Sequence, residues 1–170
     1  MTIYSYDRII TQLAVLLIDS KLNKQILWGY YMDNIKIIKR AITVNEFIEM
    51  RDSVGWGYPE KNTLLKGLSN SLFFVCAEHK DKIVGYGRII GDGAFTLYIQ
   101  DIMVKPAYQR SGLGTAIMTE IMTHIRDTYA SGTMVCLMSA KGKEKFYKKF
   151  NFIERPNEHY GAGMIQFLDK

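Results

Sequence analysis

The sequence contains few cysteines and none in a metal-binding pattern, which excludes several classes of protein. Cys76 and Cys136 are the only two among 170 residues. Neither belongs to a Cys-x-x-Cys or Cys/His cluster with metal-ligand spacing, so we expect no zinc and no other metal. Both lie in apolar, strand-like runs, which favours buried, unpaired thiols in a reducing compartment. We therefore expect a cytoplasmic protein without a disulfide framework.

Long apolar runs are also lacking. The run at residues 13–18 is far shorter than the roughly 18 to 20 residues that span a bilayer. Asp7 precedes it and no small-residue cleavage site follows, so we predict neither a membrane partner nor a signal peptide. Residues 6–28 are predicted to be helical. The first strand pattern of a compact domain begins near Met32, so we divide the chain into an N-terminal extension, residues 1–31, and a domain, residues 32–170. The extension is either an appended segment or sequence upstream of the natural start.

The excess of positive charge is small. The 22 Lys and Arg residues outnumber 17 Asp and Glu residues, for a net charge of +5. This balance suits an anionic ligand, but it is too weak to indicate a nucleic-acid partner, and the chain has no helix-turn-helix or stacked-aromatic signature. The 48% hydrophobic and 23% charged composition is that of an ordinary globular protein long enough for one core.

Hydrophobic periodicity predicts an α+β fold. Thr43 and Glu46 match a capping box, so a helix should begin at Val44. Three successive strands joined by tight turns should be antiparallel, and the strand after the central helix should be parallel to the third. The predicted strands are residues 35–40, 72–77, 83–90, 95–104 and 134–138, with short strands at 152–154 and 164–168 closing the sheet. The predicted helices are residues 44–53, 60–68 and 143–150, and a central amphipathic helix with Leu113, Ile117, Ile121 and Ile125 at four-residue spacing.

A glycine-containing turn at residues 109–115 joins the strand at 95–104 to this central helix. The first amides of a helix have no partner inside the helix and carry the positive end of its dipole, so they can bind an anion. Gly112 and Gly114 keep side chains away from an approaching phosphate. The glycine order and the late position of the turn differ from a dinucleotide-binding fingerprint, and Gly114-Thr115 lacks the lysine of a P-loop. The turn therefore predicts a pyrophosphate site.

The pattern Gln109-x-x-Gly112-x-Gly114, after a strand that ends in Val104-x-Pro106, resembles the signature of the GCN5-related N-acetyltransferase (GNAT) superfamily. Residues 145–152, Lys-Phe-Tyr-Lys-Lys-Phe-Asn-Phe, are similar to its Phe-Tyr-x-Lys-x-Gly-Phe segment. Asn151 replaces the usual glycine, and Asn is the next-best residue for a left-handed backbone. The resemblance covers residues 35–168. It implies a mixed, mostly antiparallel sheet flanked by helices, with splayed parallel strands at the cofactor site.

The resemblance also implies acetyl-CoA as the acyl donor. Backbone groups of Ile102, Met103 and Val104 would pair with its pantetheine arm as a third strand would. The other cofactor-binding residues that it implies are Gln109, Arg110, Ser111, Gly112, Leu113, Gly114, Thr115, Lys143 and Phe146. The lysines at positions 141, 143, 145, 148 and 149 are either partners of the CoA 3′-phosphate or a solvated helix face.

Acetyl transfer to an amine requires that the amine lose a proton and that the leaving thiolate gain one. By resemblance, Tyr147 lies near the CoA sulfur, and a phenol with a pKa near 10 is protonated at neutral pH. Tyr147 is therefore the candidate acid, the alternative being a core tyrosine. Asp101 is the only carboxylate of its strand and the candidate base. A structural Asp101, capping a turn or pairing with a lysine, fits equally, and Glu60 and His159 are further candidates.

The acceptor side is less readable. Trp56, Tyr58 and Arg88 are candidate walls of the acceptor pocket, and an aromatic pair could hold an amine partly by cation–π contact. Trp56 could equally fill the core. The glycine-rich residues 158–164 are a candidate pocket rim or dimer edge, so a homodimer stays open. The sequence thus favours direct acetyl transfer from acetyl-CoA to a primary amine of a small molecule or protein, and the alternative is a CoA-binding sensor without turnover.

Overall fold

The computed structural model describes residues 34–168. The helix predicted at residues 6–28 lies outside them. The sheet consists of β1 (Lys36–Ile38), β2 (Phe73–His79), β3 (Lys82–Gly91), β4 (Thr96–Val104) and β5 (Met134–Cys136), in that spatial order. The first four strands are antiparallel neighbours and β5 is parallel to β4. The predicted mixed, mostly antiparallel sheet is confirmed.

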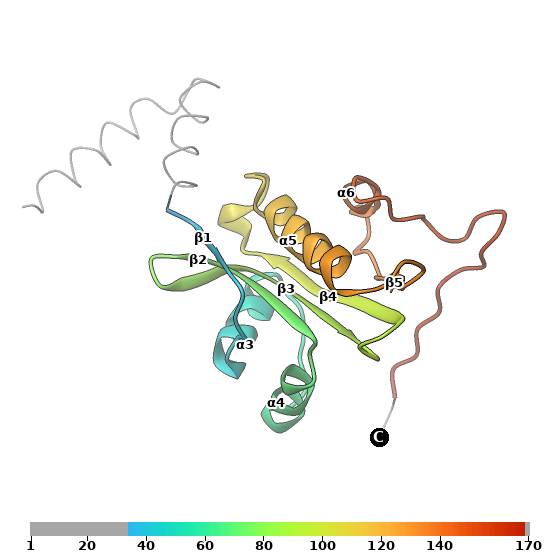
Figure 1. Ribbon diagram of the computed structural model, residues 1–170. Coiled ribbons are helices and arrows are strands. Elements are labelled where there is room, and N and C mark those ends of the chain that lie inside the picture. The colour runs from blue at the N-terminus through green and yellow to red at the C-terminus, as the bar shows by residue number, and fades with distance from the viewer. Residues whose placement is uncertain (1–33, 169–170) are drawn as a thin grey trace, which may run out of the picture.

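Helices cover both faces of this sheet (Figure 1). Helices α3 (Val44–Ser53) and α4 (Lys61–Ser69) lie on one face. Helix α5 (Leu113–Thr128) packs on the other, where the short α6 (Glu144–Lys148) contributes to the same apolar cluster. Helix α3 begins at the predicted residue because the Thr43 hydroxyl accepts from Glu46 N–H while Glu46 accepts from Thr43 N–H, which completes the capping box.

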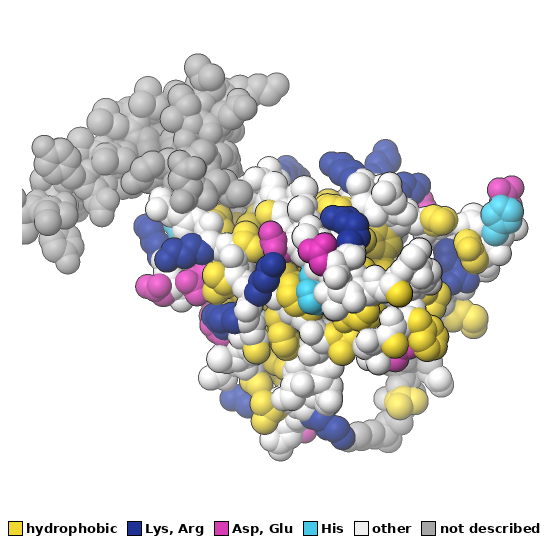
Figure 2. Space-filling model, in the orientation of Figure 1, with side chains coloured by type: hydrophobic (Ala, Val, Ile, Leu, Met, Phe, Trp, Pro, Cys, Tyr) yellow, Lys and Arg dark blue, Asp and Glu magenta, His cyan; other side chains and the backbone are white. Residues whose placement is uncertain are grey.

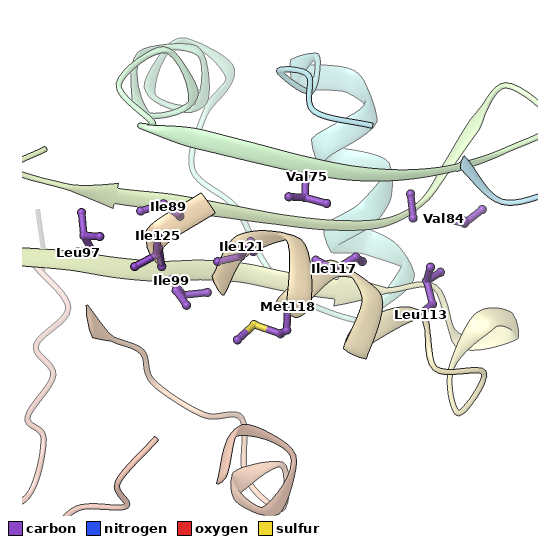
Figure 3. Close-up of a cluster of buried hydrophobic side chains, with 11 residues drawn as sticks. Val75, Val84, Ile89, Leu97, Ile99, Leu113, Ile117, Met118, Ile121 and Ile125 are labelled. Atoms are coloured by element: carbon purple, nitrogen blue, oxygen red, sulfur yellow. The ribbon is translucent and has the colours of Figure 1, made fainter. Parts of the chain in front are cut away.

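The larger part of the core, which we call the α5 cluster, lies between α5 and the sheet. The predicted stripe of Leu113, Ile117, Ile121 and Ile125 is at most 5% exposed and points onto the strands (Figure 3). Glycine on β3 permits this approach, since a Cβ at Gly87 would lie 2.5 Å from Ile102 Cδ1 and 2.9 Å from Ile121 Cδ1. A second cluster, the α3 cluster, lies under α3 and α4 and is built around Phe47, Met50, Tyr86 and Met103.

A bulge interrupts β4 in the middle. Arg88 pairs with Gln100 and Tyr86 pairs with Met103, so the single residue between them on β3 opposes two residues on β4. Asp101 is one of these two and has a left-handed φ of +56°. The extra residue changes the face of the sheet to which the following side chains point. Ile99, before the bulge, packs with the α5 cluster, whereas Met103, after the bulge, packs with the α3 cluster. This bulge decides which face of the sheet Asp101 points to.

The two parallel strands part soon after they meet. Their pairing runs from Thr96–Met134 to Tyr98–Cys136 and then stops, although β4 continues to Val104. Strand β5 is thus shorter than the predicted 134–138. We call the place where pairing stops, just beyond Tyr98 and Cys136, the fork. Among the described residues, β4 has no strand partner on this side beyond the fork, so backbone groups there that no side chain engages are available to a ligand.

The prediction that residues 152–154 and 164–168 form strands and close the sheet is wrong. The structure gives residues 152–168 no strand, and Figure 1 shows this segment running away from β5. A turn redirects the chain, because the Asn157 side-chain oxygen accepts from the amides of His159 and Tyr160. The apolar side chains of the predicted last strand are left outside, with Met164 90% and Phe167 80% exposed.

Candidate active site

The glycine turn between β4 and α5 presents unpaired amides. Arg110 (φ +63°) and Gly112 (φ +89°) both adopt the left-handed conformation that reverses the chain ahead of Leu113. The first backbone hydrogen bond that leads into α5 runs from Ala116 N–H to the Gly112 carbonyl at 3.0 Å. The amides of Gly114 and Thr115 therefore lack a partner in the helix, at the positive end of its dipole. This is the geometry of an anion site.

Two side chains predicted to bind the cofactor instead brace the turn. The Gln109 amide nitrogen donates to the Val104 carbonyl at 3.0 Å. The Ser111 hydroxyl donates to the Tyr108 carbonyl at 2.6 Å and accepts from Leu113 N–H at 3.4 Å. These bonds hold the loop in shape, so contact with an anion would come mainly from backbone N–H groups.

The two sequence motifs meet in space. A Cβ on Gly114 would lie 3.6 Å from Phe146 Cζ and 3.8 Å from Val104 Cγ2, so the turn, the end of β4 and α6 pack at one point. The residue after α6 that replaces the usual glycine, Asn151, has φ +64°, as predicted for an Asn that follows a helix. The fold thus places the Phe-Tyr segment beside the glycine turn.

Tyr147 lies on α6, half-buried against the α5 cluster. Its ring is 5.0 Å from Phe146 and 6.3 Å from Phe152, both edge-on. Burial raises the pKa of its hydroxyl, and the nearby Tyr98 adds to the effect. The phenol is therefore neutral at physiological pH and keeps a proton that it can donate.

Tyr98 is a fork residue that the sequence reasoning did not select. It is the last β4 residue paired with β5. Burial raises the pKa of its hydroxyl, and the nearby Met138 backbone lowers it by a smaller amount. Its partner across the pair, Cys136, is half-buried rather than buried as expected, whereas Cys76 is fully buried and burial raises its pKa to about 11. Only the pairing of β4 with β5 shows that Tyr98 and Cys136 lie side by side at the fork.

Asp101 lies on the α3 side in a buried ion cluster. Its Oδ1 is 2.7 Å from Arg51 Nη1 and its Oδ2 is 2.8 Å from Arg88 Nε, and its side chain is fully buried. Both carboxylate oxygens are thus engaged by guanidinium groups. This geometry favours the structural alternative for Asp101, with two arginines in place of the lysine that we considered.

The predicted acceptor residues fall in two places. Arg88 contacts Asp101. The Trp56 ring is 5.4 Å from the Arg51 guanidinium and packs on the α3 cluster. Trp56 is therefore part of the core and also borders the arginines. Tyr58 lies apart, 43% exposed, on a cavity of about 460 Å³ between α3 and the start of α4. Sequence reasoning missed Arg51, although it is four residues after Phe47 and thus on the same face of α3.

Lys and Arg side chains gather over α6 (Figure 2). The five lysines of this region are all exposed. Lys148 forms an ion pair with Glu154 and is about half-exposed. The other four form no ion pair with a described residue, so Lys143 and its neighbours are free to meet an anion or to face solvent.

The comparisons with known proteins agree with this arrangement. The model of the acetyltransferase (GNAT) domain matches residues 59–168. The chain belongs to the GNAT family. Its sheet of five strands flanked by helices is that of GNAT structures: a probable acetyltransferase of unknown function from methicillin-resistant Staphylococcus aureus is 31% identical, with a TM-score of 0.71 over 78% of this chain and 99% of the other.

Two curated relatives of this GNAT protein are similar at the sequence level. An uncharacterized N-acetyltransferase from Pyropia yezoensis is 29% identical over 122 residues, which is 69% of each chain. A GCN5-related N-acetyltransferase from Arabidopsis thaliana, named as chloroplastic, is 29% identical over 115 residues, or 65% of this chain and 57% of its own.

Within residues 34–168, no helix is both long and apolar enough to cross a membrane. The same residues contain no group of three or more His, Cys, Asp and Glu side chains placed to hold a metal ion.

Proposed function

We propose that this GNAT protein transfers the acetyl group of acetyl-CoA directly to a primary amine of a small molecule or protein. The observation that carries the proposal is the fork on β4, together with a turn after the end of that strand in which the Gly114 and Thr115 amides lack a helix partner. The pyrophosphate would lie on the amides of residues 110–115. The pantetheine arm would take the pairing that β4 lacks at residues 102–104, as an added strand does.

Tyr147 is the acid in this proposal. The bond between the acetyl carbon and sulfur breaks as the amine nitrogen bonds to that carbon, and the departing thiolate takes the Tyr147 proton. The attacking nitrogen gives up its second proton to solvent as the amide forms, and solvent returns a proton to the phenolate. The raised pKa of Tyr147 supports this role, because the hydroxyl stays protonated at pH values up to and above its ordinary pKa of about 10.

None of the three candidate bases is well placed to take the amine proton. The carboxylate of Asp101 holds two arginines. Glu60 caps α4, where it accepts from the amides of Asn62 and Thr63. His159 is 76% exposed beside Glu158, in the segment that runs away from the sheet. We infer that the proton passes from the amine to solvent before attack.

Thiol release with a panel of amines, combined with the Tyr147→Phe variant, tests the proposal. We expect kcat to fall at least about tenfold, because the leaving thiolate loses its proton donor, with little change in acetyl-CoA affinity. The conservative control is Phe150→Tyr, which leaves Tyr147 in place. Unchanged kcat in Tyr147→Phe, with chemistry rate-limiting, would remove Tyr147 from the mechanism.

The alternative function, a CoA-binding sensor, predicts a different pair of results. Acetyl-CoA would raise the melting temperature of the protein because it binds the folded state, yet no amine would release thiol. If acetyl-CoA does not change the melting temperature at all, both functions are wrong.

The compartment and oligomeric state belong to the proposal as well. We propose a cytoplasmic enzyme, although a relative is named as chloroplastic, and fractionation of cells that produce the protein distinguishes the two compartments. A homodimer stays a prediction that the mass of the purified protein in solution tests.

A further inference from the structure

Two arginines share one carboxylate on the α3 side of the sheet. Arg51 and Arg88 both contact Asp101, and neither forms an ion pair with any other described carboxylate. The cluster therefore carries one uncompensated positive charge. The exposed fractions are 21% for the Arg51 side chain, 14% for Arg88 and 0% for Asp101. A positive charge that is mostly removed from water is costly unless an anion accompanies it.

Each guanidinium keeps one nitrogen unused. Arg51 donates through Nε to the Gly57 carbonyl at 2.7 Å and through Nη1 to Asp101. Arg88 donates through Nε to Asp101 and through Nη1 to the Gly67 carbonyl at 3.1 Å and Ser71 Oγ at 3.0 Å. Neither Nη2 has a partner among the described residues. Neither is fully enclosed, because the one fully buried, unbonded side-chain polar atom of the described chain is the Tyr86 hydroxyl.

Aromatic rings hold the two guanidinium groups in place. The Phe47 ring is 5.7 Å from each, and the Trp56 ring is 5.4 Å from that of Arg51. Such contacts limit rotation of the arginine side chains and keep water away from them. Fixed guanidinium groups with free N–H donors match the oxygen atoms of a carboxylate or phosphate.

We propose that Arg51 and Arg88 bind an anionic group of the amine acceptor, so that the acceptor is an amine that also carries a carboxylate or a phosphate. This inference rests on the proposed acetyl transfer. The anion is assigned to the acceptor and not to CoA because the two sites lie on opposite faces: the glycine turn packs with Phe146 on the α5 side, whereas both arginines face α3.

The position of the cluster along β4 suits such an acceptor. Arg88 lies opposite Gln100, and Asp101 immediately precedes the residues proposed to pair with the pantetheine arm. The fork begins three residues earlier, beyond Tyr98. An acceptor whose anion contacts the arginines can therefore extend its amine along the α3 side to the fork.

Matched pairs of amines test the inference. Phosphoethanolamine is compared with ethanolamine, and β-alanine with β-alaninamide, by thiol release at saturating acetyl-CoA. We expect the anionic member of at least one pair to have a kcat/KM more than about tenfold higher, mainly through a lower KM, since a charge-assisted bidentate contact is worth about one factor of ten or more. The pair that responds identifies phosphate or carboxylate as the group. Equal or higher values for both neutral members would overturn the inference and leave the acetyltransferase proposal standing.

Arg51→Lys separates recognition from a structural role. Lysine keeps the charge beside Asp101 but cannot also offer a second nitrogen to a ligand. We expect KM to rise at least about tenfold for the anionic acceptor alone, with KM for its neutral partner and for acetyl-CoA changed less than about twofold. The control is Arg126→Lys, which replaces an arginine of α5 that, within residues 34–168, bonds only to Thr123. An equal change for both members of the pair would show a structural role and sink the inference.

A binding measurement covers the case in which no amine is turned over. Phosphoethanolamine and β-alanine are titrated into protein saturated with acetyl-CoA, and the melting temperature is followed. A rise with either compound in the native protein that Arg51→Lys and Arg88→Lys abolish supports the arginine site even if acetyl transfer fails. No rise with either compound, together with no preference in turnover, would refute it.

Discussion

At the scale of single residues, Asp101 shows how neighbours decide a role. A carboxylate on the strand before the glycine turn was a reasonable candidate base. The bulge turns it to the α3 side, where Arg51 and Arg88 occupy both oxygens. A carboxylate in this setting contributes by neutralising buried positive charge and by tying β4 to α3 and β3.

Replacing this carboxylate should be costly. Asp101→Asn leaves two guanidinium groups without their anion, so we expect the free energy of unfolding to fall by about 3 kcal/mol, as for other broken buried ion pairs. Urea denaturation measures the loss. The control is Glu154→Gln, whose pair with Lys148 is about half-exposed on both sides and should contribute less than about 1 kcal/mol. Equal losses in the two variants would contradict the buried cluster.

At the scale of secondary structure, the ends of elements matter as much as their apolar faces. Helix α3 begins with a capping box, and Arg40 joins it through a bond from Nη1 to Glu46 Oε2 at 3.0 Å. Strand β4 gains a fork because its parallel partner is only three residues long. The N-terminal end of α3 thus stabilises that helix, whereas the early end of β5 leaves part of β4 open to a ligand.

The Glu46 carboxylate makes helix α3 sensitive to acid. Its hydrogen bonds with Arg40, and secondarily with Thr43, lower its pKa to about 2. Since the folded pKa lies below the unfolded value, the stabilisation is present above about pH 4.5 and is lost as the pH falls towards 2. We expect Glu46→Gln to reduce the free energy of unfolding by about 2 kcal/mol at pH 7.

The difference between Glu46→Gln and the native protein should shrink progressively below pH 4.5, as measured by urea denaturation at pH 7, 4 and 3. Glu49→Gln on the same helix is the control, because this carboxylate is 63% exposed in its pair with Lys105. A Glu46→Gln difference that stays constant from pH 7 to pH 3 would argue against the depressed pKa.

At the scale of the whole molecule, the sheet and the fully buried residues of both clusters lie between β1 and α6. The glycine turn, the fork and the arginine cluster belong to this region too. A division of the chain near residue 32 therefore leaves every described part of the candidate site in one domain.

Removing residues 1–31 tests this division. We expect the shortened protein to keep its melting temperature within about 3 °C, since a change of that size corresponds to about 1 kcal/mol in a domain of this length. It should also keep the stabilisation by acetyl-CoA. Loss of the acetyl-CoA effect would place part of the cofactor site in the first 31 residues and overturn the proposed boundary.

The sequence by itself determined the local elements and the position of the glycine turn between β4 and α5. Helix α3, the antiparallel strands, the stripe on α5, and the left-handed Gly112 and Asn151 follow from short-range rules: capping, alternation, four-residue spacing and the steric freedom of Gly and Asn. Those rules act over a few residues, so a pattern in the chain is enough to apply them.

Only the tertiary structure decided the rest. The parting of β4 from β5, the partners of Asp101 and the absence of strands in residues 152–168 depend on groups far apart in the chain. Arg51 and Asp101 are fifty residues apart in sequence, yet they lie 2.7 Å apart in the fold. A carboxylate can be a base or an ion-pair partner, and an apolar run a strand or an exposed segment, because the choice rests on which distant atoms the fold brings beside it.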